Sequence, residues 1–193
     1  GKSVHYRVDL GGRRSIKKKI VWWIGEGEVE RDLVDHVRRH LARAFERPAV
    51  LWNGLERPRH AYDPRRKQHA SGVILRWLLE AGPGGGKVLG VTDRDLFIPI
   101  LTYVFGEAQL GGGAAVVSTA RLLEDVELVG PRLLVERLAK EAVHEVGHAF
   151  GLVHCGTHGC VMARSPAVRE VDEKTSELCG ECRDRLLELN GGA

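Results

Sequence analysis

The sequence of 193 residues lacks any apolar run long enough to cross a bilayer, so we expect no membrane-spanning segment. A charge excess is also missing, because 29 basic and 26 acidic side chains leave a net charge of +3. Two segments, 13–19 and 57–67, are locally basic, and we interpret them as solvated faces rather than as a nucleic-acid surface. Asparagine and glutamine occur twice each, and this scarcity of thermolabile side chains is typical of heat-adapted proteins.

Residues 1–19 lack the apolar core of a secretory signal, since this segment is basic and contains glycine. We therefore expect a cytoplasmic location, where thiols stay reduced. The chain length predicts a single domain, 1–193, and we expect a monomer.

The run His144-Glu145-Val146-Gly147-His148 has the spacing of a zinc-binding helix. Positions i and i+4 share one face of a helix, so the two histidines can direct their imidazole nitrogens at one ion. Glu145 lies about 100° around the helix from His144, which suits a carboxylate that contacts a metal-bound water rather than the metal.

An apolar stripe predicts that this helix begins at Pro131, since proline is tolerated in a first turn. The stripe consists of Val135, Leu138, Ala142, Val146 and Ala149. We expect Arg137, Lys140 and Glu141 on the polar side of the helix, next to the histidines.

A glycine and a third histidine extend the motif. Gly151 is expected to end the helix in a left-handed conformation, so that His154 returns to the same ion. Three neutral imidazoles leave one zinc position open, which is typical of a catalytic site. A water there would have its pKa lowered to roughly 7, and Glu145 could move its proton to a leaving amine. The alternatives are a surface helix that carries histidines and a zinc site without turnover.

All four cysteines lie in the last fifth of the chain, as two closely spaced pairs: Cys155 with Cys160, and Cys179 with Cys182. In a reducing compartment this pattern favours four thiolate ligands of a structural zinc, with disulfides or a redox pair as alternatives. Because Cys155 is bonded to His154, this metal would hold the third histidine in place. We interpret His158, in the intervening loop, as a solvated side chain.

This combination of motifs resembles the archaemetzincins, a family within the metzincin clan of zinc peptidases. The resemblance extends from His144 to Cys182, and it is weaker at Asp95–Phe97, Tyr103–Gly106 and Val117–Leu122. It implies a catalytic zinc on the three histidines and a second zinc on the four cysteines. It also implies that Glu145 is the general base and that Met162 forms the turn beneath the metal.

The sequence departs from other metzincins in two places. Cys155 follows the third histidine, where many metzincins carry a side chain that marks their family. Some metzincins use a tyrosine beyond the methionine turn, whereas Tyr6, Tyr62 and Tyr103 all lie upstream here. Stabilisation of an oxyanion is therefore expected from zinc or from backbone groups.

The order of apolar and helical patterns predicts an α/β (α+β) fold of metzincin type, with a mixed, twisted β-sheet and flanking helices. We expect strands at 20–24, 49–55, 87–92, 102–105 and 114–119, and helices at 28–45 and 71–81, besides the active-site helix. The segment 172–190 is expected to contain a last helix, with Cys179 and Cys182 near its start. In the last helix Leu186, Leu187 and Leu189 are expected to point inward. Ala114–Val117 is our candidate for an exposed edge strand along which a substrate peptide lies.

We expect residues 1–151, including the active-site helix, to form an upper subdomain, and 152–193 to form a lower one with the structural zinc. The predicted function is a zinc metallopeptidase, a hydrolase that cleaves a peptide or protein substrate through a zinc-activated water with Glu145 as general base. The alternative is a catalytically weak, zinc-stabilised module that binds peptides or nucleic acid.

Overall fold

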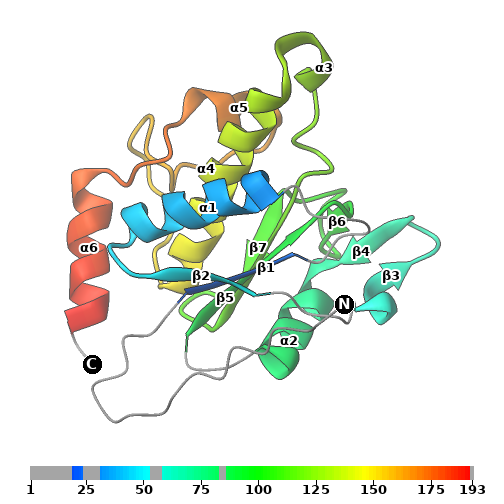
Figure 1. Cartoon of the computed structure of the whole chain (residues 1–193), viewed down its shortest axis with the longest axis horizontal. Helices are drawn as coiled ribbons and strands as arrows, with labels where there is room; N and C mark the ends of the chain where they lie inside the picture. Colours follow the sequence, from blue (N-terminus) through cyan, green and yellow to red (C-terminus); the bar gives the residue numbers. More distant parts are fainter. Residues whose placement is uncertain (1–18, 24–30, 53–57, 83–85, 192–193) are drawn as a thin grey trace.

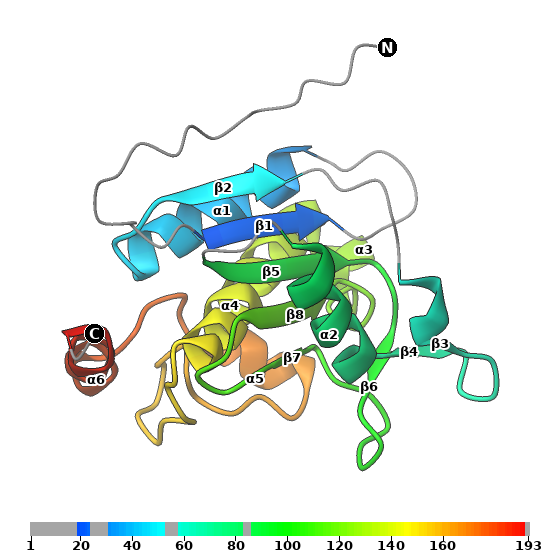
Figure 2. The same ribbon diagram turned by 90° about the horizontal axis from the view of Figure 1, so that it is seen from below.

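A five-stranded mixed sheet forms the centre of the computed structural model, which describes residues 19–23, 31–52, 58–82 and 86–191 (Figure 1). The strands are β1 (Lys19–Trp23), β2 (Ala49–Trp52), β5 (Lys87–Thr92), β7 (Gly106–Ala108) and β8 (Ala114–Ser118). Their order is β2-β1-β5-β8-β7, in which the first four are parallel and β7 runs antiparallel to β8 (Figure 2).

Helices cover both faces of the sheet. On one face lie α1 (Arg31–Ala44) and α4 (Pro131–Ala149), and on the other lies α2 (Ser71–Ala81) (Figures 1 and 2). Successive strand residues face opposite sides, so Val116 packs with the α2 cluster and Val117 with the cluster around α1 and α4. Because both faces are covered, β8 is buried throughout, and its sequence shows no polar alternation.

Shorter elements complete the fold. A second sheet of order β3-β4-β6 lies beside α2. Its elements are η1 (Arg59–Ala61), β3 (Tyr62–Asp63), β4 (Gln68–Ala70) and β6 (Leu96–Phe97), and the remaining helices are α3 (Val126–Val129), α5 (Val168–Glu173) and α6 (Gly180–Gly191). Within the described ranges, no helix combines the length and the apolar character needed to cross a membrane.

Several predicted elements are confirmed. The helix at 71–81, the strand at 87–92 and the start of the active-site helix at Pro131 match the structure. Residues 24, 28–30 and 53–55, which the predicted elements include, lie outside the described residues, as do the basic residues of 13–18. The pattern at 71–81 arises from the packing of one helix face, whereas 87–92 is a short apolar run that is buried on both faces of the sheet. Both signals are local in the sequence, which explains the success of these predictions.

The predicted edge strand was wrong. Ala114–Val117 belongs to β8, which lies between β5 and β7 and has no exposed residue. The edge strands of this sheet are β2 and β7, and β7 is the one that pairs with β8. The strand expected at 102–105 is displaced to β7, and Val104 forms only an isolated bridge with Leu96. A strand of three residues carries too little alternation to be recognised from sequence.

The helix expected within 172–190, with Cys179 and Cys182 near its start, is confirmed as α6, and α5 precedes it as a separate helix. Leu186 is buried as expected, whereas Leu187 and Leu189 are 67% and 39% exposed. Only one narrow stripe of α6 therefore contacts the core.

Of the charged residues expected on an open polar face of α4, Arg137 and Glu141 are buried and Lys140 is half-buried. Arg137 is 2% exposed and donates to both carboxylate oxygens of Asp172, at 2.8 and 2.7 Å. One turn later, Lys140 donates to the carbonyl of Val171 at 3.0 Å. Together with a buried ion pair at Glu141, these contacts hold the end of α5 against the active-site helix.

That ion pair joins Lys174 Nζ and Glu141 Oε1 at 2.7 Å, with both side chains at most 4% exposed. Replacing Lys174 with methionine should leave a buried carboxylate unpaired and lower the free energy of unfolding by about 3–5 kcal/mol. The double variant Lys174→Met, Glu141→Met should recover most of that loss, because it removes both charges.

Urea unfolding of the zinc-loaded protein measures these changes. Arg169→Ala is the matched control, since it breaks the exposed Arg169–Glu173 pair and should change stability by less than about 1 kcal/mol. Equal losses for Lys174→Met and Arg169→Ala would contradict the importance of the buried pair.

Candidate metal centre

The active-site helix ends in a turn that reverses the chain beneath its own last residues. Gly151 has a φ of +98°, and its N–H donates to the carbonyl of His148 at 2.8 Å. The next N–H, of Leu152, donates to Gly147 at 3.0 Å, which completes the hydrogen-bond pattern of a Schellman helix stop. This left-handed glycine was predicted from sequence, and the turn returns His154 toward the helix.

The three motif histidines come together as predicted. Their rings have centroid separations of 4.6 Å (His144–His148), 4.9 Å (His148–His154) and 5.4 Å (His144–His154). One nitrogen of each ring lies within 4.8 Å of the others, and Nε2 of His144 and Nε2 of His148 are 3.1 Å apart. Two nitrogens bound to one tetrahedral zinc would be about 3.4 Å apart, so the group fits such an ion.

Hydrogen bonds set the tautomers of the two helical histidines. Nδ1 of His144 donates to the carbonyl of Val161 at 2.8 Å, and Nδ1 of His148 donates to the carbonyl of Leu152 at 2.7 Å. A carbonyl can only accept, so Nε2 of each ring carries the free lone pair that a metal needs.

The surroundings favour neutral imidazoles. Burial, and then the positive charge of Lys174, hold the pKa of His144 well below its usual value. Burial is also the main cause that lowers the pKa of His148 and of His154. The neutral ring is the form that binds metal, so the site is prepared for an ion at neutral pH.

Glu145 is 6% exposed and lies beside the histidines on α4. Burial, and then the negative charge of Glu141, raise the pKa of Glu145 well above its usual value. A carboxylate with a raised pKa accepts a proton more readily near neutral pH, and a bound cation would act in the opposite direction. The geometry therefore allows proton transfer by this side chain.

The four cysteines form a second group in which all sulfurs lie within 4.8 Å of one another. Sγ of Cys155 lies 3.8 Å from Sγ of Cys179, and Sγ of Cys160 lies 3.8 Å from Sγ of Cys182. All four are free thiols, and an edge of about 3.8 Å is what four sulfurs bound at about 2.3 Å around zinc would have. A disulfide would require about 2.05 Å, so the arrangement favours a metal over the alternatives.

Backbone amides assist this thiol cluster. A hydrogen bond from the backbone of Cys182 is the main cause that lowers the pKa of Cys179 to about 7. The thiolate is the metal-binding form, so Cys179 offers a ligand at neutral pH. His158, in the same loop, is exposed and does not belong to the cluster, in agreement with its predicted role.

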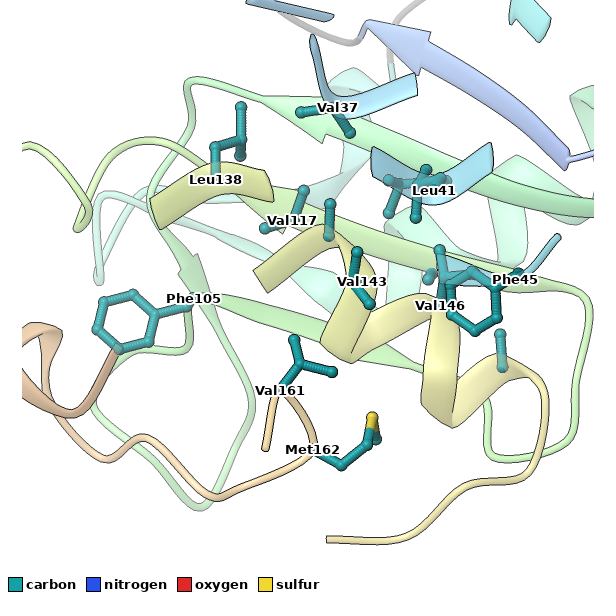
Figure 3. Close-up of a cluster of buried hydrophobic side chains, with 14 of the residues drawn as sticks. Val37, Leu41, Phe45, Phe105, Val117, Leu138, Val143, Val146, Val161 and Met162 are labelled. Carbon is teal, nitrogen blue, oxygen red and sulfur yellow. The ribbon is translucent and has the colours of Figure 1, made fainter. Parts of the chain in front are cut away.

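Met162 lies beneath the histidine-bearing turn of α4, with its sulfur directed at the helix (Figure 3). A Cβ built on Gly147 would lie 2.5 Å from the Met162 sulfur and 3.1 Å from its terminal methyl. The carbonyl of Met162 also accepts from the backbone N–H of Cys155 at 2.9 Å, which joins the two candidate sites. Gly147 thus leaves the space that Met162 occupies.

Three residues near the site were given no role in it by the sequence analysis. The buried pair of Glu141 and Lys174 affects the pKa of Glu145, and Gly106 of β7 lies against the Glu145 side chain. The i, i+4 spacing of Glu141 and Glu145 was a signal for the first, and Gly106 belongs to the Tyr103–Gly106 stretch that resembles the family. Lys174 has no signal in the local sequence.

Comparisons with known proteins agree with this geometry. A sequence model of peptidase family M54 matches residues 84–188. An archaemetzincin of Methanopyrus kandleri is 39% identical over 158 residues, which cover 82% of this chain and 87% of that protein.

Two crystal structures resemble the whole fold. Archaemetzincin from Methanopyrus kandleri has a TM-score of 0.83 at 34% identity and covers 94% of this chain and 99% of its own. Archaemetzincin from Archaeoglobus fulgidus, complexed with malonate, has a TM-score of 0.74 at 34% identity and covers 87% and 99%. The predicted α+β fold of metzincin type is thereby confirmed.

Gly147→Ala should destabilise the protein by about 1–2 kcal/mol, because the added methyl overlaps Met162 in a closely packed site. In isolation the change would favour the helix by about 1 kcal/mol, since alanine has the higher helix propensity. The clash is therefore tested in a Met162→Ala background, where the same substitution should become neutral or stabilising. Denaturant unfolding of the four proteins gives the comparison, and an equal cost in both backgrounds would refute the contact.

Proposed function

The chain belongs to peptidase family M54, the family of the archaemetzincins, and we propose that it hydrolyses peptide bonds with Glu145 as general base. Membership makes the protein a zinc metallopeptidase that acts on peptide substrates. The single observation that supports the proposed chemistry is the convergence of three imidazoles beside a buried glutamate on α4.

We assign His144, His148 and His154 to the catalytic zinc. When bound there, zinc supplies Lewis acidity, which polarises the peptide carbonyl and lowers the pKa of a water ligand to about 7. Glu145 accepts a proton from the attacking water on a carboxylate oxygen and returns it to the nitrogen of the leaving amine. Glu145 and His144 are buried, which strengthens electrostatic interactions on that side of the site, whereas His154 is exposed.

The open side of β7 is the proposed place for the substrate backbone. Ser118 N–H donates to Phe105 and Gln109 N–H donates to Ala114, at 2.8 and 3.0 Å. In an antiparallel pair every second residue bonds its partner strand, so Gly106 and Ala108 direct their N–H and C=O groups to the open edge. An extended peptide could bond to these groups as an added strand.

We assign Cys155, Cys160, Cys179 and Cys182 to a second, structural zinc. This ion would position His154 through the bond between residues 154 and 155, and the Met162 carbonyl through the Cys155 N–H. We keep the division into an upper subdomain, 1–151, and a lower one, 152–193, as part of the proposal. A cytoplasmic setting and a monomer that does not bind nucleic acid complete the proposal, and the free thiols agree with that setting.

Glu145→Gln should retain zinc but lower kcat by about 10²–10⁴-fold, because the amide cannot accept the proton. Glu136→Gln, on the exposed side of the same helix, is the matched control and should leave kcat unchanged. Mass spectrometry of peptide-library digests, with zinc content measured in parallel, follows both variants. Comparable cleavage by Glu145→Gln and wild type would remove Glu145 from the role of base.

The same digest discriminates between the proposed function and its alternatives. Cleavage that a chelator abolishes and zinc restores supports the peptidase, and the cut positions show whether it acts within chains or at their ends. A zinc-loaded protein that binds the library without cutting it indicates a binding module. Strongly salt-dependent binding of RNA or DNA would favour the nucleic-acid alternative.

Replacing both Cys179 and Cys182 with serine should weaken zinc binding at the histidines by about 10–100-fold, because their supporting residues lose their anchor. Competition with a chromophoric chelator measures the affinity, and elemental analysis counts the ions. His158→Ala is the matched control within the same loop and should retain wild-type values. Two zinc equivalents and full activity in the serine variant would show that the sites are independent.

A further inference from the structure

Gly106 occupies a position on β7 whose side-chain direction points at the active-site helix. It pairs with Val117, whose side chain belongs to the cluster between the sheet and α4. The next residue, Glu107, faces the opposite side, where its carboxylate lies 3.9 Å from a Cβ built on Gly72 of α2. A side chain at position 106 would therefore extend toward α4.

No space for such a side chain exists. A Cβ built on Gly106 would lie 2.6 Å from Cγ and 2.9 Å from Cδ of Glu145, and 2.6 Å from the carbonyl oxygen of Val116. Carbon atoms in van der Waals contact are separated by about 3.5–4.0 Å, so the overlap is severe. The bare backbone of Gly106 is thus in direct contact with the Glu145 side chain.

Backbone conformation does not explain this glycine. Gly111 and Gly151 have φ angles of +66° and +98°, where other residues are strained, whereas Gly106 lies outside that region. Glycine inside a strand costs stability by about 0.5–1 kcal/mol relative to alanine. The space required by Glu145 and by β8 is the reason that remains.

Packing is also what holds Glu145. Within the described ranges, no hydrogen bond or ion pair restrains its carboxylate, although the side chain is 6% exposed. Its position therefore depends on the walls around it, of which Gly106 is one. Gly106 also directs its own N–H and C=O to the open edge of β7, where the proposed substrate strand binds.

We propose that Gly106 is a positioning residue for Glu145, in that its missing side chain sets the distance between the carboxylate and the edge strand. The catalytic consequence depends on the proposed function, because it assumes that Glu145 is the base. The physical contact does not depend on it. A Cβ at position 106 displaces the carboxylate from the place where a substrate carbonyl would be attacked.

The contact is tested by thermal unfolding of zinc-loaded wild type, Gly106→Ala, Glu145→Ala and the double variant. Gly106→Ala should lower Tm by about 4 °C or more in the wild-type background, because it overpacks a closed site. The drop should be clearly smaller in the Glu145→Ala background, where Cγ and Cδ are gone. Equal drops in both backgrounds would overturn the proposal, since they would assign the whole effect to Val116.

If Gly106→Ala alone does not fold, the contact is tested by whether the double variant, Gly106→Ala with Glu145→Ala, folds. A folded double variant supports the proposal, because removal of Glu145 relieves the overlap. Failure of both to fold overturns it, because strand spacing alone would then require the glycine.

Catalysis is tested by steady-state kinetics on a peptide that wild type cleaves. Gly106→Ala should retain zinc and lower kcat by about 100-fold, the loss expected for a group displaced by about 1 Å, with a much smaller change in KM. Gly72→Ala is the matched control, since its added Cβ meets only an ordinary contact, and it should retain wild-type kinetics.

Unchanged kcat in Gly106→Ala, or a raised KM alone, would overturn the positioning role. If wild type cleaves no peptide while it retains zinc, the proposed function fails instead. The unfolding comparison still decides the Gly106–Glu145 contact in that case.

Discussion

Close packing of the active-site helix is the constraint on which the rest of this structure depends. One side of α4 lies against the edge strand β7 and the other against Met162, and each contact occurs at a glycine, Gly106 or Gly147. Protein interiors are packed as densely as organic crystals, so two such contacts leave the helix little freedom to shift. His144, His148 and Glu145 project from this confined part of the helix. Their geometry therefore depends on the missing side chains of Gly106 and Gly147 as well as on the atoms that contact them.

Charge reinforces this confinement. Arg137, Lys140 and Glu141 follow one another along α4, and all three contact residues 171–174. Buried charges stabilise a fold only when they are paired, so the contacts define one docking position of the C-terminal segment on the helix. The same charges act on the candidate site, because Glu141 raises the pKa of Glu145 and Lys174 lowers the pKa of His144. Docking and local electrostatics therefore involve the same side chains.

The two candidate metal groups are connected by covalent and hydrogen bonds rather than by proximity alone. One half of the connection is covalent, because His154, which follows the helix stop at Gly151, is bonded to Cys155. The other half is the hydrogen bond from Cys155 N–H to the carbonyl of Met162. A metal on the cysteines would consequently restrain both the third histidine and the residue beneath the first two.

The sequence by itself determined the features that arise from short-range geometry: the i, i+4 histidines, the left-handed turn at Gly151, the paired cysteines, the periodic helix at 71–81 and the short apolar strand at 87–92. Each depends on the spacing of neighbouring residues along a helix or strand, which the order of residues states directly. Only the tertiary structure decided that β7 rather than β8 is the edge, that Arg137 and Glu141 are buried, and that Gly106 meets Glu145. The last two features join segments more than 30 residues apart through close packing and charge pairing, and the first depends on how neighbouring strands pair. Such contacts have no periodicity along the chain.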